Sequence, residues 1–209
     1  MQSILNLSKT NKLILAIFAF LAVLAFGSGR VHAATLAVDS NCTLNEAIDA
    51  TNNAVDGNGC VKTGTAYGTN DTINLPAGTI TLSENLNSFT SGADIVVQGA
   101  GKAVTTIDAN GYRGFTANAA NTIDKTLNGF KIIDASPYAI DINGAHDITI
   151  DDVEVENSSF GVRIGAVHIT VTNTNIHDNV ATGNSVGLYL IANAVNSTDD
   201  ISITVADSQ

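Results

Sequence analysis

Three eight-residue stretches decide the fold: LNGFKIID (127–134), IDDVEVEN (150–157) and VTNTNIHD (171–178). Each carries apolar or Thr side chains at its first, fourth and sixth positions and ends in Asp or Asn, and their starts are 23 and 21 residues apart. A second strand repeats beside them, starting at Ile140, Val162 and Leu188 with offsets of 22 and 26 residues. Self-similarity at such a period is typical of solenoids. Because the strands are rich in β-branched residues, the sequence predicts an all-β fold, a parallel β-helix.

The solenoid is expected to occupy residues 71–209, which at about 23 residues per repeat gives roughly six rungs. Leucine-rich repeats share this length, but their fixed Leu spacing is missing. Side chains that alternate with the buried ones should point outward and form columns across the rungs. One such column is predicted at Thr126, Thr149, Thr170 and Ser202.

The first 33 residues have the pattern of a secretory signal peptide. Lys9 and Lys12 precede an apolar run over residues 13–26, and a small-residue site ends at Ala33. A membrane anchor is the alternative, but a span needs about 20 apolar residues, and this run has 14. We therefore expect cleavage after Ala33 and no membrane insertion of the mature chain.

Removal of this leader changes the charge of the chain. Residues 34–209 keep 6 of the 9 basic residues and all 20 acidic ones, so the formal net charge falls from −11 to −14. Binding to nucleic acid needs clustered Lys and Arg to displace counterions from phosphates. Docking on anionic lipid has the same requirement. Both classes of partner are therefore excluded as general functions.

Residues 34–70 are expected to form a cap with one helix, over residues 43–53. Thr43 and Glu46 have the spacing of a capping box, in which each side chain satisfies a free amide at the helix start. Cys42 and Cys60 flank this helix and its loop, and in an exported chain with two cysteines they are expected to form a disulfide. An open solenoid end exposes apolar core, so the helix is placed to cover it.

Two segments carry a resemblance to a known family: CTLNEAIDATNN (42–53) and DTINLPAGTITL (71–82). Together they resemble the CSLREA-domain family of exported bacterial proteins, in which this motif leads into a right-handed parallel β-helix of the pectin-lyase-like type. The chain departs from the motif at Thr43, where Ser is usual, and at Asn45, where Arg is usual. The resemblance implies a right-handed coil and an extracellular or cell-surface location. It implies no single reaction, because β-helices serve as enzymes, adhesins and stalks alike.

The candidates for chemistry are Glu154, Glu156 and His177. The repeat offset places Glu156 beside His177 on the next rung, and a carboxylate next to an imidazole could perform acid–base chemistry. Several carboxylates could also hold Ca²⁺, although the chain has no specific metal-binding motif and no metal site is predicted. The alternative is a solvated, partly paired surface, because Lys131 is expected beside Glu154 and Arg163 beside Asp141.

The neighbouring pairs His146-Asp147 and His177-Asp178 are interpreted as polar groups of turns, because no Ser partner lies in register with them. Asp56-Gly-Asn-Gly59 is interpreted in the same way, as a turn.

Two functions remain open from sequence. The favoured one is an exported, non-catalytic surface or secreted module, such as an adhesin, stalk or matrix component, whose partner is carbohydrate or another cell-surface polymer. The alternative is a polysaccharide lyase or glycoside hydrolase acting on the outer face of the β-helix. A net charge of −14 disfavours acidic polysaccharides, and only eight aromatic residues follow the leader.

The last residues, 201–209, read as the start of another rung. We therefore expect the solenoid to continue in a longer protein. A chain that ended here would expose a strand edge, which favours edge-to-edge association.

Overall fold

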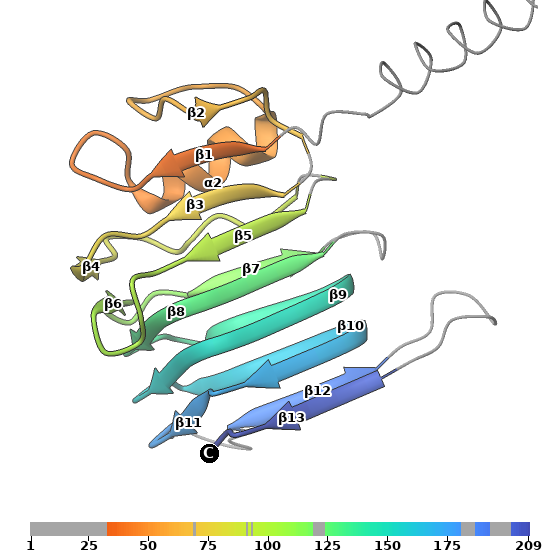
Figure 1. The fold of residues 1–209 in the computed structure, drawn as a ribbon. Coiled ribbons are helices and arrows are strands. Elements are labelled where there is room, and N and C mark those ends of the chain that lie inside the picture. The colour runs from red at the N-terminus through yellow and green to blue at the C-terminus, as the bar shows by residue number, and fades with distance from the viewer. Residues whose placement is uncertain are drawn as a thin grey trace, which may run out of the picture. The chain divides into compact units, whose positions relative to one another are not determined.

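The computed structural model describes residues 33–68, 70–90, 92, 94–118, 124–180, 187–192 and 202–209. Thirteen strands and one helix form a β-solenoid in which successive strands lie side by side (Figure 1). The predicted all-β, parallel β-helix fold is therefore confirmed. The hand of the coil stays a prediction. The predicted leader lies in residues 1–32, outside the described part, and within that part no helix is long and apolar enough to cross a membrane.

Strands of the first column stack from one end of the solenoid to the other. The column contains β1 (Ala34–Ala37), β3 (Asp71–Asn74), β5 (Ile95–Gln98), the start of β8 (Lys125–Ile133), the middle of β9 (Tyr138–Glu156), the end of β10 (Phe160–Thr172) and β13 (Ser202–Ala206). All these pairings are parallel. At the outer edge β1 also pairs antiparallel with β2 (Thr63–Gly64).

Two further columns complete the coil. The second contains β4 (Gly78–Thr81), β6 (Thr105–Asp108), the ends of β8 and β9, and β11 (Asn175–His177). The third contains β7 (Phe115–Asn118), the starts of β9 and β10, and β12 (Leu188–Ala192). About four rungs of the described chain carry strands in all three columns, fewer than the expected six. The difference arises because the rungs at the two ends lack one or more of these strands.

The predicted register is confirmed at the repeat positions. Ile150 pairs with Leu127 on one side and with Val171 on the other, and all three side chains are buried. Thr149 lies between Thr126 and Thr170, as expected for an outward column. The assignment of Ser202 to this column was wrong: Thr204 pairs with Thr170, and Ser202 pairs with His168. The last repeat is longer than the earlier ones, so an offset taken from them misplaces the strand by two residues.

Aliphatic side chains of successive rungs fill the interior of the solenoid, and a short aromatic stack crosses it. The rings of Phe89 and Phe115 lie 6.0 Å apart and nearly parallel, and Phe130 follows at 5.4 Å from Phe115. All three are at most 1% exposed. Large buried side chains of this kind stabilise the stack by removing apolar surface from water.

The polar residues that end each repeat have a backbone reason to be there. Asp134, Asn157 and Asp178 lie at the same corner of successive rungs and have φ between 52° and 55°. This left-handed conformation is unfavourable for most L-residues and is adopted most readily by Gly, Asn and Asp. The chain therefore bends at these positions without a loop insertion.

Helix α2 (Leu44–Asn53) lies at the first rung and begins as predicted. The Thr43 side chain accepts a hydrogen bond from the Glu46 backbone N–H, and the Glu46 carboxylate accepts one from the Thr43 N–H at 2.8 Å. The buried face of α2 consists of Leu44, Ala47, Ile48, Ala50 and Thr51. The disulfide Cys42–Cys60 closes the loop that contains the helix. Both cysteines are buried in the core.

Side-chain amides attach α2 to the segment that follows β4. Asn45 accepts a hydrogen bond from the Asn87 N–H at 2.7 Å, and Asn52 accepts one from the Thr90 N–H at 2.8 Å. Asn52 also donates to the Ser88 carbonyl. A ten-residue helix is marginal in isolation, so this docking and the buried face are what hold it in place.

Candidate functional site

The structure brings the three predicted candidates together on the outer face of the second column. Glu154 and Glu156 lie at the end of β9, and His177 lies on β11 opposite Glu156. His177 Nε2 is 3.7 Å from Glu154 Oε1. One ligand atom from each of the three residues lies within 4.8 Å of the others. The register argument from sequence is therefore confirmed for these residues.

A lysine occupies the centre of this group. Lys131 Nζ lies 2.5 Å from Glu154 Oε1 and 2.6 Å from Glu156 Oε2. The hydrogen bonds from these carboxylates raise the pKa of Lys131 above its ordinary value, so the ammonium stays charged. The pKa of His177 is also raised, chiefly by a hydrogen bond to Asp178. The two glutamates are thus neutralised by Lys131, and this arrangement fits a surface ion-pair network better than an acid–base pair or a Ca²⁺ site.

A different face of the solenoid carries an aromatic surface, defined here as Tyr138, Phe160, Arg163 and Tyr189. Tyr138 begins β9 and Phe160 begins β10, and the register pairs them directly. Their rings stack with centroids 4.9 Å apart and an angle of 28° between planes. The Arg163 guanidinium lies 4.5 Å from the centre of the Tyr138 ring, a cation–π contact.

The other members complete this surface. Tyr189 on β12 pairs with Arg163 and is 46% exposed. Arg163 donates two hydrogen bonds to Asp141, from Nε at 2.7 Å and from a terminal nitrogen at 2.6 Å. This bidentate pair fixes the guanidinium plane and leaves the surface without net charge. Three consecutive rungs therefore present rings and a fixed, neutral pair of polar groups.

Two shallow hollows adjoin each other along this face. The first, of about 290 Å³, is lined by the four residues of the aromatic surface and Val162. The second, of about 270 Å³, shares Arg163 and Tyr189 and continues along Ile142, Asn143 and Ile191. The pair forms an elongated depression with apolar and aromatic walls and a few polar groups. Ligand sites commonly combine these features.

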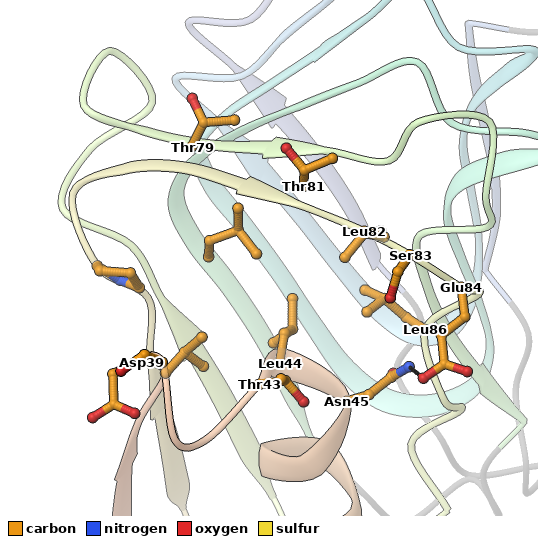
Figure 2. Close-up of a pocket in the computed structure, with 14 residues that line it drawn as sticks. Asp39, Thr43, Leu44, Asn45, Thr79, Thr81, Leu82, Ser83, Glu84 and Leu86 are labelled. Atoms are coloured by element: carbon orange, nitrogen blue, oxygen red, sulfur yellow. Dashed lines mark hydrogen bonds between the residues drawn. The ribbon is translucent and has the colours of Figure 1, made fainter.

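The largest cavity, of about 400 Å³, lies between α2 and β4 (Figure 2). Its walls include Leu44 from the helix, Thr79 and Thr81 from β4, and Leu82 and Leu86 beyond it.

Two carboxylates line this cavity. Asp39 accepts hydrogen bonds from the backbone N–H groups of Asn41 and Cys42, and Glu84 accepts one from the Asn45 amide. Both acids thus serve the attachment of the cap, and the cavity is the seam between cap and solenoid.

Comparison with models of protein families, with curated proteins and with solved structures gives no match. The resemblance to the CSLREA-domain family therefore stays a prediction that rests on residues 42–53 and 71–82.

The sequence reasoning missed the aromatic surface, although a signal for it was present. The 22-residue offset that places Asp141 beside Arg163 also places Tyr138 beside Phe160. That offset was applied to charged residues alone, and the small number of aromatics was taken as evidence against a ligand platform. What decides the matter is the register, which gathers four of these side chains on one face.

Proposed function

We propose that this chain is an exported, non-catalytic binding module that holds a saccharide at the aromatic surface of Tyr138, Phe160, Arg163 and Tyr189. The observation that carries the proposal is the stacked ring pair beside a half-exposed Tyr and an Arg–Asp pair of fixed geometry. Aromatic faces pack against the apolar faces of sugar rings, and the guanidinium and carboxylate can hydrogen-bond to hydroxyl groups. The basic leader of the sequence and the Cys42–Cys60 disulfide support the export of the chain.

The charge of the site supports a neutral saccharide. Arg163 is paired with Asp141, so it offers no free positive charge to a polyanion. The mature chain has a formal net charge of −14, which repels acidic polymers at long range. A neutral glycan meets neither obstacle.

The arrangement of the acids supports binding without cleavage. Glycosidases use two carboxylic acids that flank the scissile bond, one of which carries a proton. Glu154 and Glu156 share one lysine, and they lie in the second column, whereas the aromatic surface lies in the third. A sugar held by the rings would therefore not be placed between these two acids.

The test is titration calorimetry of the folded chain with neutral β-linked oligosaccharides and with oligomers of galacturonic acid. Neutral oligomers should bind, and Tyr189→Ala should weaken binding at least about tenfold by removing a ring from the centre of the site. Ile203→Ala is the matched control, because Ile203 is equally exposed, at 46%, but lies in the first column. Affinity that is unchanged in both Tyr138→Ala and Tyr189→Ala would overturn the proposed site. New reducing or unsaturated ends in the incubated oligosaccharide would overturn its non-catalytic character.

A further inference from the structure

Two histidines from neighbouring rungs converge on one carboxylate at the corner that precedes the first column. His146 and Asp147 are consecutive in β9, and His168 on β10 pairs with Asp147. His168 Nδ1 lies 2.5 Å from Asp147 Oδ1, and His146 Nδ1 lies 3.0 Å from the same oxygen. The two imidazole rings are 5.2 Å apart and inclined by 76°. Three potential metal-ligand atoms are therefore already gathered at one point.

A second carboxylate adjoins this group from the preceding rung. Asp124 Oδ1 lies 3.8 Å from His146 Nδ1. The same oxygen accepts a hydrogen bond from the Asp147 backbone N–H at 3.1 Å, which fixes its position relative to the three other groups. The four side chains thus come from three consecutive rungs, which the solenoid register holds in place.

The contrast with Glu154, Glu156 and His177 is informative. There the Lys131 ammonium lies between the carboxylates and takes the place of a cation. At the other corner, the ion-pair partners of Asp147 within the described part of the chain are His146 and His168, neither of which carries a fixed charge. The first group is balanced by a lysine, whereas the second offers donors that a metal ion would satisfy.

We propose that His146, Asp147 and His168 bind one divalent transition-metal ion of the Zn²⁺ type, with Asp124 placed to supply a fourth ligand. Two imidazole nitrogens and a carboxylate oxygen suit Zn²⁺ better than Ca²⁺ or Mg²⁺, which prefer oxygen ligands. One donor atom from each of the three residues lies within 4.8 Å of the others. Tetrahedral Zn²⁺, with bonds of about 2.0–2.2 Å, needs donors only slightly more than 3 Å apart, so small side-chain shifts complete the site.

The ion would join three rungs of the solenoid. Because its ligands are gathered only in the folded chain, the free energy of metal binding adds to the stability of the folded state. This role is independent of saccharide binding, because the ligands lie at the first column and the aromatic surface at the third.

The experiment is titration of Zn²⁺ into the metal-stripped full chain, purified without a polyhistidine tag, with thermal unfolding followed in parallel. We expect one Zn²⁺ per chain and a rise in unfolding temperature that excess Ca²⁺ does not reproduce. His146→Gln and His168→Gln should each weaken Zn²⁺ binding at least about tenfold. Each of these variants is checked for native circular dichroism before titration.

His177→Gln is the matched control, since it removes the histidine of the other cluster and should leave Zn²⁺ affinity unchanged. Co²⁺ offers a second readout that does not depend on stability, because a site with imidazole ligands gives visible absorption bands that the His168→Gln variant should lose. The proposal would be overturned if the full chain took up no Zn²⁺. It would equally be overturned if uptake were lost in His177→Gln and retained in His146→Gln.

Discussion

Lys125 is a charged side chain placed inside the solenoid. It begins β8, pairs with Ile95 and Ile148 in the first column, and is 2% exposed. Burial lowers the pKa of Lys125 to about 8, and the nearby carboxylates of Asp94 and Asp124 oppose this shift only in part. The alternation of the strand predicts an apolar residue at this inward position, so the lysine reduces stability whenever it is protonated.

This burial predicts a rise in stability with pH. Between about pH 8 and pH 10.5 the unfolded chain keeps a proton on Lys125 that the folded chain has lost, so the free energy of unfolding increases with pH in that window. Between pH 7 and pH 9.5 the gain should be on the order of 2 kcal/mol. Urea unfolding of the full chain at several pH values measures it.

The variant Lys125→Met should be more stable than the parent chain at pH 7 and should lose the rise between pH 8 and pH 9.5. Lys102→Met is the control, because Lys102 is part of a surface ion pair with Asp152, and it should keep the rise. A parent chain whose stability is flat or falls over this window would contradict the buried position of Lys125.

A second prediction at the residue scale concerns the corner at Asn157, where φ is 52°. Asn157→Val should destabilise the fold by about 1–2 kcal/mol, because a β-branched side chain in the left-handed region clashes with the backbone. Asn157→Gly should be tolerated much better, since Gly adopts this conformation freely. Chemical denaturation of the two variants provides the comparison, and equal losses would show that the side-chain amide matters more than the backbone.

At the scale of single elements, the cap helix is the part of the fold whose local chemistry is most explicit. The capping box of Thr43 and Glu46 satisfies amides that the helix itself leaves open. Thr43→Ala should lower the free energy of unfolding by about 1 kcal/mol, whereas Thr43→Ser, which keeps the hydroxyl, should change it little. Both are measured by denaturation with the disulfide intact. A loss as large in Thr43→Ser as in Thr43→Ala would show that the threonine methyl group, and not the cap, is responsible.

Single elements also show where sequence reasoning succeeds and where it does not. The helix and its capping box, and the pairing of Leu127 with Ile150, follow from local signals that repeat without interruption. Ser202 was misplaced because the repeat that leads to it is longer than those before it. Register is cumulative along a solenoid, so one repeat of unusual length shifts every assignment beyond it.

At the scale of the whole solenoid, function depends on which side chains share a column. The register brings Glu156 to His177, as expected, yet Lys131 lies between the two glutamates and makes them an ion-pair network. The same register gathers Tyr138 with Phe160 and Asp147 with His168. These two groups could be derived from the offsets alone, but stacking of the rings and convergence of the histidine nitrogens on one oxygen depend on side-chain conformations that periodicity does not specify.

The separation of these groups between columns also predicts that saccharide binding is insensitive to salt. Arg163 and Asp141 neutralise each other at the aromatic surface, so no net charge is screened when a neutral sugar binds. The dissociation constant should change by less than about twofold between low salt and roughly 0.5 M salt. Calorimetry at the two ionic strengths tests this, and a steep weakening with salt would point to a charged ligand.

The central claim, that a neutral saccharide binds at the aromatic surface, is tested most directly by nuclear magnetic resonance titration of the labelled chain with a neutral β-linked oligosaccharide. We predict that the largest shifts occur at the rings of Tyr138, Phe160 and Tyr189 and at the Arg163 side-chain N–H. Intermolecular contacts should join these rings to sugar protons, and the oligosaccharide should remain intact. Shifts centred on Glu154, Glu156 and His177 or on the cavity beside α2, or a cleaved oligosaccharide at the end of the titration, would contradict the account.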